Sequence, residues 1–174
     1  VKFYANFKIE NSGTIKINKN WVHTNDNSST KGTYNSAYFT IKNSSGAIIK
    51  ATGSAGSYSY SSSGSVTKLK LNSSNTLTIS GLPTDTYTVY EYGYGDNDGI
   101  PYYTRNSGYL TANVSAGSTS SLTFTNTRNV GTLKVNKTWT HNKAQTANYD
   151  DVYFIIKNSS GDFIKASGNA GSYT

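Results

Sequence analysis

The sequence contains no cysteine and no methionine among its 174 residues. Without cysteine, the chain can hold no disulfide bond, no thiolate metal site, no cysteine nucleophile and no internal thioester. Hydrophobic residues are also few, at 34%, which is below the average of globular proteins. Because these residues alternate with Ser, Thr, Asn and Tyr, the sequence predicts an all-β protein with polar outer faces and not a disordered chain.

Acidic residues are scarce. The chain has 9 acidic and 16 basic residues, which gives a net charge of +7. The lysines are scattered and arginine occurs only at Arg105 and Arg128, so no basic cluster forms that would indicate nucleic-acid binding. No apolar run is long enough to span a membrane, so we expect no membrane insertion. No signal peptide begins the chain, as expected for a mature fragment.

Motifs for metal binding and catalysis are lacking as well. His23 and His141 each lie two residues after a tryptophan, but two histidines are too few for a metal site. The stretch DNDG at residues 96–99 lacks the remaining ligands of a calcium loop, so we expect a turn there. No Ser–His–Asp set stands in a recognisable context. We therefore expect no metal, no cofactor and no free-standing enzyme.

An internal repeat organises the chain. GTIKINKNW at residues 13–21 recurs as GTLKVNKTW at residues 131–139, and the 22 residues from Tyr38 match those from Tyr153 at 16 positions. Such self-similarity is typical of tandem domains. We interpret residues 13–129 as one complete domain and residues 130–174 as the N-terminal part of a second, truncated one. Residues 1–12 are expected to be a linker or the closing strand of a preceding repeat.

Short alternating segments within the complete repeat predict about seven strands separated by turns. Such a pattern is typical of a β-sandwich, for example of the Ig-like kind, here in tandem repeats. Turns are expected at NSSG (43–46), GLPTDT (81–86) and SAGSTS (115–120). The expected strands include residues 15–21, 39–41, 48–51, 69–71, 77–79, 87–92, 109–114 and 121–127.

Three polar residues share the core face of three of these strands. Since side chains two residues apart point the same way, Lys19 follows Ile15 and Ile17, Glu91 follows Tyr87 and Val89, and Asn126 follows Leu122 and Phe124. Each has an ordinary explanation when taken singly: a lysine that reaches solvent from a strand end, an acid where a strand leaves the core, and an asparagine that caps a turn. Together they are harder to explain in this way, because a buried lysine and a buried glutamate are each costly unless they are paired.

These three residue types can form an amide crosslink. In an apolar core, desolvation lowers the pKa of a lysine, which then becomes a nucleophilic amine. A carboxylic acid in the same core keeps its proton and can polarise an asparagine carbonyl and carry a proton to the leaving group. Lys19 would attack Asn126, ammonia would leave, and Glu91 would promote this single turnover. The strands would hold the reacting groups in place.

GTIKINKNW, ISGLPTDTYTVYEYG and LTFTNT resemble the B-type repeat domains of Gram-positive collagen adhesins and pilins, called Cna B-type. The resemblance implies a prealbumin-like β-sandwich with a spontaneous isopeptide bond between Lys19 and Asn126, promoted by Glu91. Asp85 replaces the glycine usual in the family's turn. Lys137 would be the nucleophile of the second repeat.

The resemblance also implies a place and partners for the chain. It implies an extracellular, cell-wall location on a Gram-positive bacterium and a structural role as a stalk or pilus-like repeat. The implied partners are neighbouring repeats of the same chain, with a host extracellular matrix protein or glycan bound through other domains.

A second function remains open from the residues alone. The stretch YEYGYGDNDGIPYY at residues 90–103 contains five tyrosines, and exposed aromatic rings can stack on sugars or protein partners. The candidate ligand contacts are Tyr94, Tyr102 and Tyr103, in the loop 92–103. In the simpler alternative, these rings cover one end of the sandwich.

Overall fold

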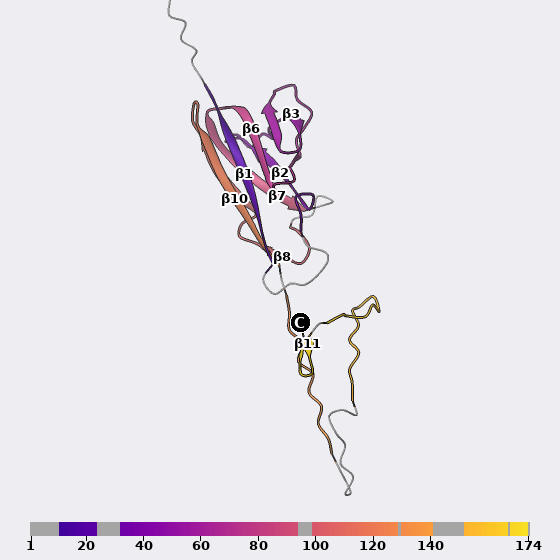
Figure 1. Cartoon of the computed structure of the whole chain (residues 1–174). Coiled ribbons are helices and arrows are strands. Elements are labelled where there is room, and N and C mark those ends of the chain that lie inside the picture. The colour runs from indigo at the N-terminus through magenta and orange to yellow at the C-terminus, as the bar shows by residue number, and fades with distance from the viewer. Residues whose placement is uncertain are drawn as a thin grey trace, which may run out of the picture. The chain divides into compact units, whose positions relative to one another are not determined.

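Alternating side chains build the strands of this chain, whose computed structural model describes residues 11–23, 32–93, 99–128, 130–140, 152–166 and 168–173. The chain divides into two compact units, Val1–Val130 and Gly131–Thr174, and each is described by itself (Figure 1). The linker or closing strand expected at residues 1–12 falls, for residues 1–10, outside the described part of the chain.

The described strands of the first unit form two sheets. The six-stranded sheet has the order β3 (Ala51–Ser54), β4 (Ser57–Tyr60), β6 (Thr76–Pro83), β1 (Ser12–Val22), β10 (Thr119–Arg128) and β8 (Tyr103–Arg105). The four-stranded sheet has the order β5 (Leu69–Lys70), β2 (Ala37–Lys42), β7 (Asp85–Gly93) and β9 (Tyr109–Val114). None of the described residues belongs to a helix that could cross a bilayer.

The inner faces of the two sheets enclose one hydrophobic core. Every second residue is buried in β2, in β7 from Tyr87, in β1 as far as Lys19 and in β6 as far as Ile79, which is the period that a strand with one covered face requires. The predicted all-β sandwich is therefore confirmed. The buried core residues on the longer strands are Ile15, Ile17, Phe39, Ile41, Leu77, Ile79, Tyr87, Val89 and Phe124.

The first and last strands of the sandwich are direct neighbours. β1 runs between β6 and β10 (Figure 1), antiparallel to β6 and parallel to β10. In the parallel pair, Lys19 lies opposite Phe124 and Trp21 lies opposite Asn126. This register brings residues more than 100 positions apart in the sequence onto adjacent strands, on the same face of one sheet.

The structure corrects the expected strands at three points. Ten strands lie in the described part of residues 11–128, against the seven or so expected, because short Ser- and Tyr-rich segments such as β4 and β8 lack the apolar alternation that marks a strand. The turn expected at residues 81–86 shrinks to Thr84, since β6 continues through Pro83 and β7 begins at Asp85. The strand expected at residues 48–51 begins only at Ala51, and Ile48 makes one isolated bridge to Lys42.

The second unit repeats the local turns of the first. The backbone bond from Asn43 N to Ala47 O (3.0 Å) recurs from Asn158 N to Asp162 O (3.0 Å). The hairpin of β11 (Gly168–Asn169) and β12 (Ser172–Tyr173) corresponds by sequence to that of β3 and β4.

The long strands of the first unit have no counterpart among the described residues of the second. Residues 131–140 form no strand, although they match β1 in sequence, and apolar side chains such as Leu133 and Val135 are exposed. A turn needs only its own residues, whereas a long strand needs a partner that is distant in the sequence.

Leu77→Ala is expected to lower the unfolding free energy of the first unit by about 2–5 kcal/mol, because it empties a fully buried position on β6. The neighbouring Thr78→Ala, on the other face of the same strand, should cost about 1 kcal/mol or less. Urea denaturation followed by tryptophan fluorescence measures both. Equal costs for the two variants would contradict the assigned core face.

Candidate functional site

Lys19 enters the core because it continues the inward face of β1. Ile15 and Ile17 precede it on that face, and their burial pulls the strand into the sandwich. The Lys19 side chain is 0% exposed. Its ammonium group therefore has no access to bulk water, which is an unusual position for a lysine.

Glu91 and Asn126 reach the same place from opposite sheets. Glu91 lies on β7 of the four-stranded sheet, opposite Phe39 on β2, and is 1% exposed. Asn126 lies on β10 of the six-stranded sheet and is also 1% exposed. The rings of Phe39 and Phe124 lie 5.1 Å apart and supply an apolar environment next to these polar groups.

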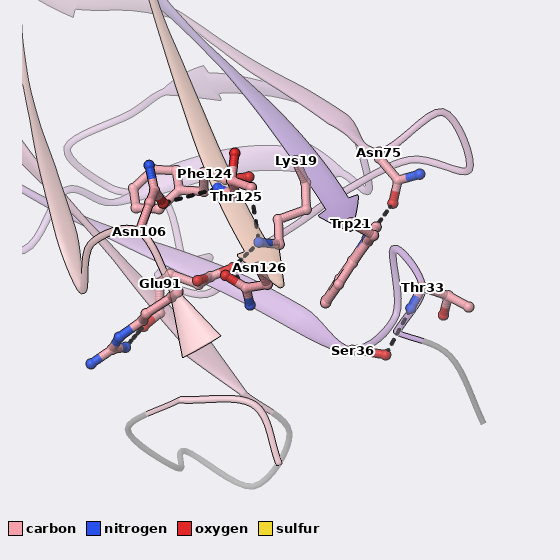
Figure 2. A network of polar contacts seen from close by, with 11 residues as sticks. Lys19, Trp21, Thr33, Ser36, Asn75, Glu91, Asn106, Phe124, Thr125 and Asn126 are labelled. Atoms are coloured by element: carbon pink, nitrogen blue, oxygen red, sulfur yellow. Dashed lines mark hydrogen bonds and ion pairs between the residues drawn. The ribbon is translucent and has the colours of Figure 1, made fainter. Parts of the chain in front are cut away.

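The three side chains point toward one another (Figure 2). Lys19 Nζ lies 2.9 Å from Glu91 Oε1 and donates a longer bond of 3.4 Å to the carbonyl oxygen of Phe124. Asn126 Nδ2 donates to the same Glu91 Oε1 at 3.5 Å. The structure thus brings together all three residues that were predicted from the sequence, with the acid between the amine and the amide.

Two oxygen atoms of this cluster lack partners. Within the described residues, neither Glu91 Oε2 nor Asn126 Oδ1 has a hydrogen-bond partner, although both are buried. A buried polar atom without a partner costs free energy of the order of 1–3 kcal/mol. A half-turn of the Asn126 carboxamide about its Cβ–Cγ bond would exchange Oδ1 with Nδ2, and a protonated Glu91 could then donate to Oδ1.

The electrostatics of the cluster favour an uncharged lysine. Burial lowers the pKa of Lys19 below its ordinary value of 10.5, and the nearby Glu91 partly opposes that shift through its charge and its hydrogen bond. Desolvation is the larger effect. The site therefore shifts Lys19 toward the neutral amine, which is the form with a lone pair available for attack.

Two side chains at this site were not assigned a role from the sequence. The first is Trp21, whose ring centroid lies 4.5 Å from Lys19 Nζ. The second is Asn75, in the turn before β6, whose Oδ1 accepts a 3.0 Å bond from Trp21 Nε1. Asn75 has a positive φ of 59°, and nothing in its local sequence distinguishes it from the other Asn-rich turns.

Lys137 occupies the position in the second unit that Lys19 holds in the first. Its Nζ lies 4.6 Å from the ring centroid of Trp139, but residues 131–140 are exposed. Its expected role as the nucleophile of a second repeat stays a prediction.

The candidate tyrosines of the 92–103 loop differ in their surroundings. Tyr94 lies outside the described residues. Tyr102 is 72% exposed and lies beside the guanidinium of Arg128. Tyr103 packs edge-on against Trp21, with ring centroids 5.2 Å apart, and its hydroxyl accepts a 2.6 Å bond from the Gly32 amide. Tyr103 therefore covers the end of the sandwich, as the simpler alternative expects.

No protein-family model matches the chain, and no curated protein matches it. Its structure is similar to that of GBS52, a minor pilin of Streptococcus agalactiae, with a TM-score of 0.53 and 21% identity over 75% of this chain. Two further structures each give a TM-score of 0.47. A streptococcal ancillary pilin is 16% identical, and the match covers 68% of this chain and 33% of that pilin. The shaft pilin SpaA of Lactobacillus rhamnosus GG is 15% identical, and the match covers 71% of this chain and 48% of SpaA.

The likeness to GBS52 shows that the chain has a pilin-like β-sandwich fold. The chain spans 50% of the length of that pilin.

The Asn126→Ala variant cannot form a crosslink. Its free energy of unfolding is expected to fall as the pH is lowered from 10.5, the ordinary pKa of lysine. The unfolded chain binds a proton at Lys19 below that pH, while the folded chain binds it only at a lower pH, so protons favour unfolding between the two values. The slope is at most about 1.4 kcal/mol per pH unit. Adding Lys19→Met should remove this dependence, which urea titrations at several pH values would measure. An unchanged slope would contradict a buried lysine with a lowered pKa.

Proposed function

We propose that residues 13–129 form a Cna B-type structural domain, which crosslinks itself through an amide bond between Lys19 and Asn126 promoted by Glu91. The observation that carries this proposal is the contact of three buried polar side chains from β1, β7 and β10. A buried lysine next to a buried acid is costly to maintain. A reaction that converts the amine to an amide would explain why the chain keeps these two groups in its core.

The reaction begins with a proton transfer inside the pair. The proton moves from Lys19 Nζ to Glu91 Oε1 along their 2.9 Å contact, which replaces two buried charges by a neutral amine and a neutral acid. Burial lowers the pKa of Lys19 and so favours its neutral amine. The Glu91 carboxyl then donates a hydrogen bond to the Asn126 carbonyl oxygen and polarises it.

The bond change is an exchange of nitrogen atoms. The lone pair of Lys19 Nζ attacks Asn126 Cγ, and the new N–C bond forms as the bond from Cγ to Nδ2 breaks. Glu91 accepts one proton from Nζ and delivers one to Nδ2, which leaves as ammonia. The amine and the amide are thus converted to one secondary amide and one ammonia, with the acid restored. The sheet register holds the amine and the amide on adjacent strands, which lowers the entropic cost of the attack.

The position of the bond suits a domain that carries tension. A pull on the two ends of the domain enters at the start of β1 and leaves at the end of β10, and these strands are parallel neighbours. An amide between Lys19 and Asn126 would join them near their C-terminal ends. The force would then pass from β1 to β10 through the bond, and residues 20–125 would lie outside the loaded path.

The proposed setting is the surface of a Gram-positive bacterium. The pilin-like fold supports it, since GBS52 is a minor pilin of such an organism. The domain would act as a structural repeat of a cell-wall-anchored or pilus-like protein, outside the cell, and would pack in series with neighbouring repeats or subunits. Its chemistry would be one self-limited reaction per domain and not turnover of another molecule.

The alternative of a ligand-binding module in the 92–103 loop receives less support. Tyr103 is engaged in packing against Trp21, so within the described part of the loop Tyr102 alone offers a largely exposed tyrosine ring. A host protein or glycan partner has no observation in its favour beyond that ring and its neighbour Arg128.

Intact mass spectrometry is expected to find the folded chain lighter than its sequence by one ammonia. Lys19→Ala, Glu91→Ala and Asn126→Ala should each restore the full mass, because each removes a group that the reaction requires. Lys16→Ala, an exposed lysine on the same strand, should leave the loss of ammonia unchanged. A full-mass wild-type chain would refute the crosslink and leave the fold assignment intact.

Single-molecule stretching by the two ends of residues 13–129 is expected to extend the wild-type domain only outside residues 20–125. The Glu91→Ala domain, which keeps the strands but lacks the proton carrier, should extend over its whole length. The contour length gained on unfolding measures the difference. Full extension of a wild-type domain at ordinary unfolding forces would disprove the load-bearing role.

A further inference from the structure

We propose that Trp21, anchored by Asn75, is a positioning residue that holds the Lys19 amine against Glu91 and shields it from water. The inference rests on the proposed crosslink and adds to it a residue pair outside the reacting groups. Trp21 cannot exchange a proton at neutral pH and its ring is not part of the bond change. It acts on the reaction only through the place and the solvation of Lys19.

The first observation is the contact between the ring and the amine. Trp21 lies two residues after Lys19 on β1, so both side chains stand on the same face of the strand. Its ring centroid is 4.5 Å from Lys19 Nζ, which is within contact distance for a cation and an aromatic face. Glu91 Oε1 contacts the same nitrogen at 2.9 Å. The ring and the acid thus confine one amine between them.

The second observation is that one residue holds both Lys19 and Trp21. The backbone oxygen of Asn75 accepts a 2.8 Å bond from the Lys19 amide, and its side-chain Oδ1 accepts a 3.0 Å bond from Trp21 Nε1. Asn75 makes both contacts from a left-handed backbone conformation, with φ at 59°. Asparagine tolerates this conformation better than most residues, but it remains a small cost in free energy.

Tyr103 contacts the indole as well. The rings of Tyr103 and Trp21 meet edge to face, with centroids 5.2 Å apart, and the Tyr103 hydroxyl is held by the Gly32 amide at 2.6 Å. Trp21 is therefore restrained both by Asn75 and by an aromatic neighbour. A ring restrained in this way can occupy the space through which water would otherwise reach Lys19.

The contact between lysine and tryptophan also recurs without the rest of the site. In the second unit, Lys137 Nζ lies 4.6 Å from the Trp139 ring, although residues 131–140 form no strand. The contact between lysine and tryptophan thus recurs in a segment that is not part of a sheet. It can bring the amine to the ring before the acid and the amide arrive.

The test measures the rate of crosslinking of the full chain. Unreacted chain, isolated in denaturant before it has folded, is diluted into buffer, and the loss of ammonia is followed by intact mass at timed acid quenches. We expect Trp21→Ala to slow the reaction by about 10- to 100-fold, the effect of a misplaced reacting group. Trp21→Phe, which keeps a ring but loses the N–H donor, should slow it by about fivefold, as expected for the loss of one net hydrogen bond.

The anchor is tested by Asn75→Gly, which removes the side chain and keeps a residue that readily adopts a positive φ. We expect a similar, about fivefold, decrease. Because Trp21→Phe and Asn75→Gly break the same bond, the double variant should react no more slowly than either single variant. Ser73→Gly, an exposed change in the same turn, is the matched control and should react at the wild-type rate. Multiplicative effects in the double variant would contradict the anchor.

The dependence of the rate on pH separates positioning from a loss of stability. Among the described residues, the Glu91 carboxyl contacts the amine, and Arg105 donates a 3.2 Å bond to the Glu91 carbonyl oxygen. Trp21→Ala changes neither, but it admits water to Lys19 and thereby favours the ammonium form. The rise of the rate with pH should therefore move to higher pH, whereas a variant that is only less folded would keep the wild-type midpoint.

A second measurement does not depend on the crosslink. In the Asn126→Ala chain, which cannot react, Lys19 is treated with an acetylating reagent and its modification is followed by peptide mass, with exposed Lys16 as the internal reference. Trp21→Ala and Asn75→Gly should each increase the acetylation of Lys19 relative to Lys16 several-fold. Unchanged acetylation would overturn the shielding role of Trp21.

The two proposals fail in different ways. A wild-type chain that keeps its full mass would refute the crosslink, and the acetylation of Lys19 would still decide whether Trp21 shields it. A wild-type chain that loses ammonia, together with a Trp21→Ala chain that reacts at the wild-type rate, would retain the crosslink and refute the positioning role.

Discussion

The contact between Lys19 and Glu91 crosses the sandwich from one sheet to the other, and the arrangement of the site depends on it. Two ionisable groups in a core are tolerated only when each satisfies the other. The pair therefore imposes a relative position on the two sheets that apolar side chains alone would leave less strictly defined. Asn126 and the two phenylalanines complete the same small volume, so the packing that stabilises the fold also fixes the arrangement of these polar groups.

Much of this site could be predicted from the sequence because strand geometry is simple. The period of two placed Lys19, Glu91 and Asn126 on inner faces, and the structure buries all three. The same pattern did not reveal that β1 and β10 are parallel neighbours or that Glu91 approaches from the facing sheet, because pairing depends on contacts between distant segments. The contacts of Asn75 with Lys19 and Trp21 could not be predicted either, because they depend on a turn conformation and on the orientation of one side chain.

A comparison of the two units distinguishes structure that depends on neighbouring residues from structure that depends on distant ones. Turns around Asn43 and Asn158 have the same hydrogen bonds in both, because asparagine side chains and glycines act over a few residues. β1, which carries Lys19, lies between β6 and β10, whereas residues 131–140, which match it in sequence, form no strand. Sequence identity between repeats is thus enough to repeat a turn, while a sheet also requires the segments that complete it.

The order of the three groups along the chain has a consequence for biosynthesis. Lys19 is made first, Glu91 follows and Asn126 comes last, on the strand that lies between β1 and β8. A growing chain therefore holds the amine and the acid while it still lacks the amide. If the amide forms as proposed, it can close only after the last long strand of the domain has been synthesised and inserted. The chain would remain without a crosslink during synthesis and would be closed irreversibly only once the domain is complete.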